Sequence, residues 1–274
     1  MGALRRAGHA AVLTVADTLH IERLARGVVR CTIDRPPLNL FEPKLIRAVR
    51  DAFRTLADDP GVRVAVLTGR GRAFTAGMDV NVLASLDVPS GKQLITSLHE
   101  AIKAVHDAPF PVVAALNGHA LGAGFELMLA CDLRVAARGG TYGLPEVRVG
   151  VPSVIEAALL APAIGPGRAA ELLLCGEAIG ADEALAWGLV NRVVAPAELE
   201  AAVNTVVDKI LAGAPAAIRL QKELMVRWRN TDLATAAEYG INAFAVSYAS
   251  ADAREGLRAF LEKRAPRWET GGPA

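Results

Sequence analysis

Two glutamates, Glu126 and Glu146, are the side chains whose type and spacing could do acid–base chemistry in this chain. Glu126 lies in the apolar run GFELMLAC, where an ionised carboxylate is costly unless it is paired or used. Glu146 follows the turn Gly143-Leu144-Pro145. Two carboxyl groups that bracket one site could act as general acid and general base, provided that their environments separate their pKa values. The ordinary alternatives are a helix-start charge for Glu126 and a solvated loop residue for Glu146.

The glycine-rich turn before Glu126 could hold an oxyanion. Gly118, Gly122 and Gly124 allow the backbone to turn sharply and leave its N–H groups uncovered. The first N–H groups of the following helix have no intrahelical acceptor. A second glycine loop, residues 74–79, could supply another N–H to the same oxygen, and an oxyanion hole generally needs two donors. The alternative for that loop is an ordinary connection between a strand and a helix.

Other chemistries find little support in the sequence. Gly69-x-Gly71 lacks the lysine and hydroxyl residue of a phosphate-binding loop, and Gly-x-Gly-x-x-Gly does not follow the early strand. Ser153 is not part of a Gly-x-Ser-x-Gly elbow, and His119 is interpreted as a turn residue. The histidines show no metal-ligand spacing, so we expect no metal site.

Composition indicates a globular protein that acts on a small molecule. Of 274 residues, 52% are hydrophobic and 22% charged, and the formal net charge is +1. No basic block is present, which argues against a nucleic-acid partner. Three scattered cysteines, Cys31, Cys131 and Cys175, indicate a reducing compartment. With no apolar stretch of membrane-spanning length, we expect a soluble cytoplasmic protein without a membrane partner.

Alternating strand and helix patterns must position the two glutamates. The patterns predict a hairpin around Arg26-Gly27 and a buried parallel strand over residues 62–68, because that run is dominated by Val and Leu. Further strands are predicted at residues 112–116, 133–136 and 189–194. Helices are predicted from residue 43 to about 57, over 91–107, after the glycine turn, over 155–164 and over 167–174.

The chain divides into three parts by pattern. Residues 1–17 read as an N-terminal extension without clear periodicity, and residues 18–195 form an α/β core. Residues 196–274 form a helical C-terminal region, with helices predicted over 197–212, 215–228, 233–249 and 252–263. The unit of strand, glycine turn and helix recurs without an exact sequence repeat.

Taken together, these motifs resemble the crotonase family of enoyl-CoA hydratases and isomerases. The resemblance begins at about residue 19 and rests on the segments FTAGMDV (74–80), NGHALGAGFE (117–126) with CD (131–132), LPE (144–146), GVP (150–152), GEAI (176–179), GLV (188–190) and FLEK (260–263). It implies an α/β fold, a crotonase-like spiral of strand-strand-helix turns. The helical C-terminal region would then mediate trimers, often paired into hexamers as dimers of trimers.

The resemblance also implies site residues. Met78 and Ala123 would give the two N–H groups that hold the thioester oxygen; relatives usually have glycine at the second position, and alanine keeps the N–H. The positions that would contact coenzyme A are Leu38, Ala76, Met78, Asp79, Val80, Ala123, Phe244 and Lys263. No metal and no permanently bound cofactor is implied, because coenzyme A enters as part of the substrate.

Both family glutamates are present, which implies reversible hydration of a 2-enoyl-CoA thioester to a 3-hydroxyacyl-CoA. Family isomerases typically keep only the later carboxylate, so Glu126 favours hydration. The sequence does not fix which glutamate is acid and which is base. Isomerisation, hydrolysis and decarboxylation of a CoA thioester are the alternatives within the family. A non-catalytic scaffold that binds acyl-CoA or RNA is the alternative of another class.

The segment after Pro152 departs from the family pattern. Hydratases usually continue with a glycine-rich segment that ends in Thr-Gln-Arg, whereas this chain has SVIEAA at residues 153–158. Bulkier residues there should reshape the acyl pocket if the segment lines it. Glu156 is interpreted as a helix-start charge, with entry into the site as the alternative.

Overall fold

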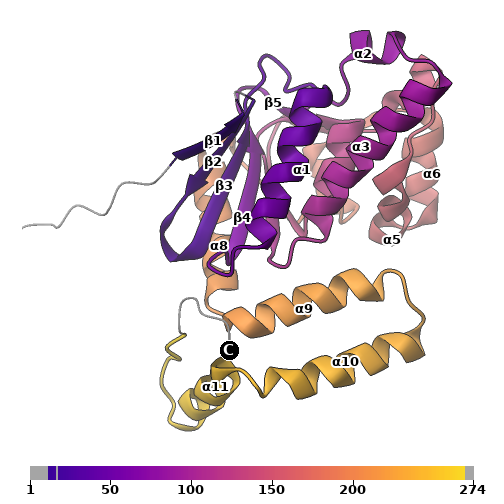
Figure 1. Ribbon diagram of the computed structural model, residues 1–274. Coiled ribbons are helices and arrows are strands. Elements are labelled where there is room, and N and C mark those ends of the chain that lie inside the picture. The colour runs from indigo at the N-terminus through magenta and orange to yellow at the C-terminus, as the bar shows by residue number, and fades with distance from the viewer. Residues whose placement is uncertain (1–11, 17, 269–274) are drawn as a thin grey trace, which may run out of the picture.

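Two sheets organise the described part of the chain, which in the computed structural model comprises residues 12–16 and 18–268 (Figure 1). The large sheet has the order β1 (Val12–Ala16), β2 (Leu19–Arg23), β3 (Val28–Ile33), β4 (Val64–Gly69), β6 (Val112–Leu116), β8 (Leu133–Ala137) and β11 (Arg192–Val194). The small sheet has the order β10 (Ala178–Gly180), β9 (Thr141–Gly143), β7 (His119–Leu121) and β5 (Ala73–Thr75). From β3 to β11 the strands of the large sheet are parallel.

The predicted strand-strand-helix unit is confirmed. Each turn of the chain gives one strand to the large sheet, one to the small sheet, and then helices. The first turn runs β4, β5, α2 (Val80–Ala84) and α3 (Val88–His106), and the second runs β6, β7 and α4 (Ala123–Ala130). The third runs β8, β9, the 3₁₀ helices η2 (Pro145–Val149) and η3 (Ile155–Leu159), α5 (Leu160–Ile164) and α6 (Pro166–Cys175). The chain then adds β10, α7 (Ala181–Ala186) and β11.

Strand β4 explains how the large sheet is covered on both faces. All six of its residues are buried, as expected for a parallel strand between two layers. Ala65 and Leu67 belong to the cluster that includes α1 (Pro43–Ala57) and α3, whereas Val64 and Val66 belong to the cluster with α8 (Leu199–Leu211). Successive side chains of a strand point to opposite faces, so α1 and α3 cover one face and α8 the other.

Helix α1 forms where the sequence predicts it. Pro43 occupies the first turn, where its missing N–H costs nothing, and Glu42 is the N-cap residue. Its buried face consists of Leu45, Ile46, Ala48, Val49, Ala52, Phe53 and Leu56. Burial of one such large apolar side chain stabilises a fold by about 1.5–3 kcal/mol. This face joins the same cluster as the apolar face of α3.

Helices α9 (Pro215–Trp228), α10 (Leu233–Ser247) and α11 (Ala251–Leu261), here called the C-terminal arm, lie below the body in Figure 1. Helix α8 precedes the arm and packs on the sheet through Val203, Val206, Val207 and Leu211. None of the residues of α10 is buried. Four of its large apolar side chains are more than half exposed: Leu233, Ile241, Phe244 and Val246. The arm therefore presents apolar surface that the rest of the described chain does not cover.

Charged side chains attach the arm to the body. Lys222 Nζ contacts both oxygens of Asp132, at 2.7 and 2.8 Å, and both residues have side chains less than a tenth exposed. Arg219, one turn before Lys222 in α9, donates to the carbonyl oxygens of Asp59 and Val62. Removal of one partner of a buried pair leaves an uncompensated charge, so Lys222 and Asp132 depend on each other.

The structure also contains strands that the sequence patterns did not indicate. Strand β1 pairs antiparallel with β2, so the large sheet extends into the segment expected to be an extension. Strands β5, β7, β9 and β10 have three residues each and were not predicted. In the described ranges no single helix has the length and apolar character needed to cross a membrane; α8 with its preceding turn and α9, bent by 104° at their junction, meet the criteria only as a pair.

Candidate active site

Glu126 lies one turn into α4 and is 3% exposed. Its carboxyl accepts a hydrogen bond from the N–H of Ala157, with an N to Oε1 distance of 3.1 Å. Burial raises the pKa of Glu126 to about 9, and the charges of Glu146 and Glu156 add to that rise. Glu126 therefore keeps its proton at neutral pH.

Glu146 approaches the start of the same helix from η2. Its side chain is half-buried, and Ser153 Oγ donates to its Oε2 at 2.8 Å. Gly122, the residue before α4, has a φ of +54°, and a Cβ added there would lie 2.5 Å from Glu146 Oε1. The absence of a side chain at Gly122 thus lets the carboxyl of Glu146 rest against the backbone at the helix start. The carboxyl of Glu146 thus lies at the start of the helix that carries Glu126.

The loop that carries Met78 approaches the backbone of Ala123 at that helix start. Ala123 is the first residue of α4, where the N–H has no intrahelical acceptor. Phe41 bonds to the backbone on both sides of Met78, to the oxygen of Gly77 at 2.7 Å and to the N–H of Asp79 at 2.9 Å. A Cβ added at Gly77 would lie 3.5 Å from the nitrogen of Ala123, so the two loops converge.

The residues expected to line a coenzyme A groove fall into two groups. Leu38 and Ala76 are joined by a backbone hydrogen bond of 3.0 Å, and Asp79 accepts from Arg35 at 3.2 Å while its side chain caps α2. Val80, the first residue of α2, is 65% exposed. Ala76, Asp79 and Val80 adjoin Met78 in one continuous loop, to which Leu38 is hydrogen-bonded. Because this loop approaches the start of α4 at Gly77, the structure brings the first group to the helix that carries Glu126.

Phe244 and Lys263 form the second group and lie on the C-terminal arm. Phe244 is on α10 and is 67% exposed, and Lys263 follows α11 and is also exposed. Figure 1 places the arm below the body, whereas α2 is at its top. The structure therefore does not bring these two residues to the glutamates within one chain.

Sequence reasoning missed three groups at this site. Ser153 and the N–H of Ala157 hold the two carboxyls, and His99 Nδ1 lies 2.7 Å from Glu156 Oε1. Glu156 does stand in the first turn of η3, as a helix-start charge would, but it is 7% exposed rather than solvated. No sequence signal links His99 to a residue so distant in the chain.

In the described part of the chain, no three histidine, cysteine, aspartate or glutamate side chains gather as a metal site would require.

Replacement of Glu126 by glutamine should stabilise the fold, and more so as pH rises. The pKa of Glu126 is raised from 4.5 to about 9, so above pH 4.5 the unfolded chain loses a proton that the folded chain keeps. Wild-type stability then falls with rising pH, whereas glutamine has no proton to lose. We expect the gain in free energy of unfolding to be near zero at about pH 4 and about 3 kcal/mol at pH 7. Urea unfolding of both proteins at equal concentration measures the difference in free energy of unfolding. A difference that does not change with pH would contradict the raised pKa of Glu126.

Comparisons with known proteins show the family to which the chain belongs. A family model described as "Enoyl-CoA hydratase/isomerase" matches residues 23–271. The chain therefore belongs to the enoyl-CoA hydratase/isomerase family, and the resemblance to crotonases drawn from the sequence is confirmed.

Among similar proteins, the crotonyl-CoA hydratase of Syntrophomonas wolfei is 36% identical over 235 residues, which cover 85% of this chain and 90% of that protein. The carnitinyl-CoA dehydratase of Salmonella typhi is 35% identical over 264 residues, 93% of this chain and 99% of that protein. The crystal structure of an enoyl-CoA hydratase from Mycobacterium smegmatis has a TM-score of 0.89 and 36% identity, and covers 92% of this chain and 99% of that chain.

Proposed function

We propose that the protein adds water reversibly across the double bond of a 2-enoyl-CoA thioester to give a 3-hydroxyacyl-CoA. The observation that carries the proposal is a pair of carboxyls at one helix, Glu126 in its first turn and Glu146 at its start, where the loop of Gly77 approaches the nitrogen of Ala123. Hydration needs a group that takes a proton from water and another that gives one to the α-carbon.

The mechanism follows from where charge develops. When the oxygen of water bonds to the β-carbon, the electrons of the double bond move toward the thioester, whose oxygen becomes an enolate. The N–H groups of Met78 and Ala123 would hold that oxygen, and such donors stabilise the transition state more than the ground state. The α-carbon then takes a proton and the thioester is restored. Glu126 and Glu146 share the two proton transfers, and the buried Glu126 enters the cycle with a proton to give.

The test is a panel of CoA thioesters with the product mass as readout. Crotonyl-CoA and longer or branched 2-enoyl-CoA esters should each gain the mass of one water, and carnitinyl-CoA belongs in the panel because a relative is named for its dehydration. Isomerisation would leave the mass unchanged, whereas hydrolysis would release free coenzyme A and decarboxylation carbon dioxide. A panel without any gain of water would refute hydration.

A non-catalytic scaffold is disfavoured by the retained glutamates. An RNA-binding role is disfavoured by a net charge of +1, because affinity for a polyanion depends on neutralising phosphates. We also propose that the protein works in a reducing compartment such as the cytoplasm. In support, all three cysteines are free, and two of them are buried.

We further propose that the exposed apolar side of the C-terminal arm packs against other copies of this chain, as a trimer or a dimer of trimers. Leu233, Ile241, Phe260 and Leu261 are each at least 68% exposed in the single chain. Large apolar side chains exposed together on one segment favour an interaction site there. Phe244 and Lys263 on the same arm would then contact coenzyme A bound to another copy.

Ile241→Asp should convert the assembly to smaller species, because a carboxylate would have to be desolvated in the apolar contact. Light scattering coupled to size exclusion measures the mass. Asn204→Asp adds the same charge on the exposed side of α8 and should leave the mass unchanged. A wild-type chain that is monomeric at micromolar concentration would refute the assembly.

A further inference from the structure

Residues 153–157 hold both candidate catalytic carboxyls. Ser153 Oγ donates to Glu146 at 2.8 Å, and the Ala157 N–H donates to Glu126 at 3.1 Å. Between these two donors stands a third carboxyl, Glu156, for which the hydration chemistry assigns no step. Glu156 is therefore part of the segment that contacts both candidate catalytic carboxyls.

Glu156 is anchored on one side only. Its side chain is 8% exposed, and Oε1 lies 2.7 Å from Nδ1 of His99 on α3. Its other oxygen, Oε2, is buried and has no hydrogen-bond partner among the described residues. Burial of a carboxyl with one oxygen unsatisfied is unfavourable, so such a group in a folded protein marks a functional constraint.

The backbone next to Glu156 is strained. Ile155 has a φ of +36°, in the left-handed region that β-branched residues avoid. A strained residue persists only where surrounding contacts fix it, and such residues gather at active sites. The next residue, Glu156, makes the hydrogen bond to His99. That bond ties the strained turn to α3.

We propose that Glu156 is a positioning residue for Glu126: held by His99, it fixes the turn whose Ala157 N–H binds the Glu126 carboxyl, and it places a like charge beside that carboxyl. The inference deepens the proposed hydration and rests on it for its kinetic consequence. Its structural part, the control of Glu126 by Glu156, can be measured without substrate.

The electrostatics around Glu126 agree with this role. Burial is the main cause of its raised pKa, the N–H groups of Ala157 and Val154 oppose the rise, and the charges of Glu146 and Glu156 increase it. Loss of the charge on Glu156 should therefore lower the pKa of Glu126, because a like charge nearby disfavours ionisation.

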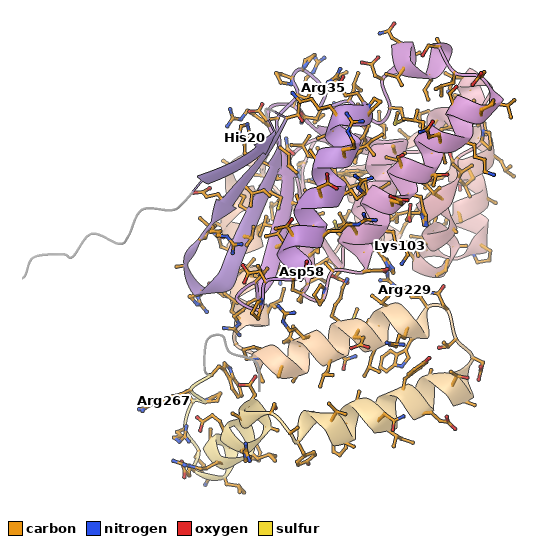
Figure 2. All side chains as sticks on the ribbon, in the orientation of Figure 1. His20, Arg35, Asp58, Lys103, Arg229 and Arg267 are labelled. Carbon is orange, nitrogen blue, oxygen red and sulfur yellow. The ribbon has the colours of Figure 1, made fainter. Side chains whose placement is uncertain are left out.

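Two histidines of α3, His99 and His106, act on the carboxyl of Glu156. Burial raises the pKa of Glu156, whereas His99, then the backbone N–H of Glu156 and then His106 lower it. His106 contacts Asp107 through Nδ1 and Arg229 of the arm through Nε2. Figure 2 shows Arg229 at the C-terminal end of α9, below Lys103 of the body.

The decisive variant is Glu156→Gln, which keeps the shape and a carbonyl oxygen for His99 but removes the charge. The carboxyl of Glu126 is followed by ¹³C NMR of glutamate-labelled protein, and its signal is assigned by its loss in Glu126→Gln. We expect the apparent pKa of Glu126 to fall by about one unit. Glu171→Gln, on the exposed side of α6, removes the same charge elsewhere and should leave the titration unchanged. An unchanged titration in Glu156→Gln overturns the proposal.

The pH profile of crotonyl-CoA hydration should move in the same direction in Glu156→Gln, with kcat at the plateau within a few-fold of wild type. Glu156→Ala also removes the anchor to His99, and we expect a further drop in kcat of about tenfold with little change in KM. Equal rates in the two variants overturn the anchoring role. Should Glu156→Ala not fold, the Gln variant alone decides through the titration. A shifted titration in a protein that hydrates no CoA thioester supports the inference and refutes the proposed function.

Discussion

Glu126→Gln and Glu146→Gln should each lower the rate of crotonyl-CoA hydration by about 10²–10⁴-fold, the range that a positioned general acid or base contributes. Glutamine keeps the size of each side chain and still accepts the hydrogen bond from Ala157 or Ser153. It cannot exchange a proton, so the loss should appear in kcat with KM little changed. Stopped-flow absorbance at the enoyl thioester band measures both constants.

The double variant supplies the sharper criterion. Residues that act in one proton-transfer cycle are strongly non-additive, so Glu126→Gln combined with Glu146→Gln should be hardly slower than the worse single variant. Glu171→Gln is the matched control and should keep the wild-type rate. If either single variant hydrates crotonyl-CoA at the wild-type rate, that glutamate takes no part in proton transfer.

Ala123→Pro should lower kcat by at least 10²–10³-fold, the loss seen when one oxyanion donor is removed. Proline has no N–H, and its ring would occupy the space in front of the missing donor. The first position of a helix is where proline is tolerated, and Ala123 is that position in α4. The fold should therefore survive, which circular dichroism and thermal unfolding can verify.

Ala123→Gly is the matched control for this donor. It keeps the N–H and removes only the methyl group, so its kcat should stay within about tenfold of wild type, allowing for the greater freedom of a glycine backbone. If the proline variant turned over as fast as the glycine variant, the oxyanion would be held elsewhere.

Much of the core architecture could be predicted from local patterns. Strand β6 and helix α9 have the predicted boundaries, because an apolar run and a proline-bounded helical period define them without help from distant residues. Strands β5, β7, β9 and β10 were missed because three residues are too few for a period. They form only where parallel and antiparallel neighbours from other turns of the chain lie beside them.

The candidate site likewise has a part that could be predicted from local sequence and a part that could not. The positions of Glu126, Ala123 and Met78 follow from motifs that are local in sequence. Their partners are not local: His99 meets Glu156 only because α3 packs against η3, and the Ala157 N–H meets Glu126 across 31 positions. The burial that raises the pKa of Glu126 is likewise a property of the packed helix and not of its sequence.

The return of α8 to the large sheet has a consequence for how the chain folds as it is synthesised. Val64, Val66 and Val113 face α8, whose residues lie between 86 and 147 positions later than these valines. Until the ribosome has released residue 211, that face of the sheet has no cover, while the opposite face can already pack against α1 and α3. The nascent protein thus carries an open apolar surface through most of its translation, the kind of surface that attracts chaperones and favours aggregation.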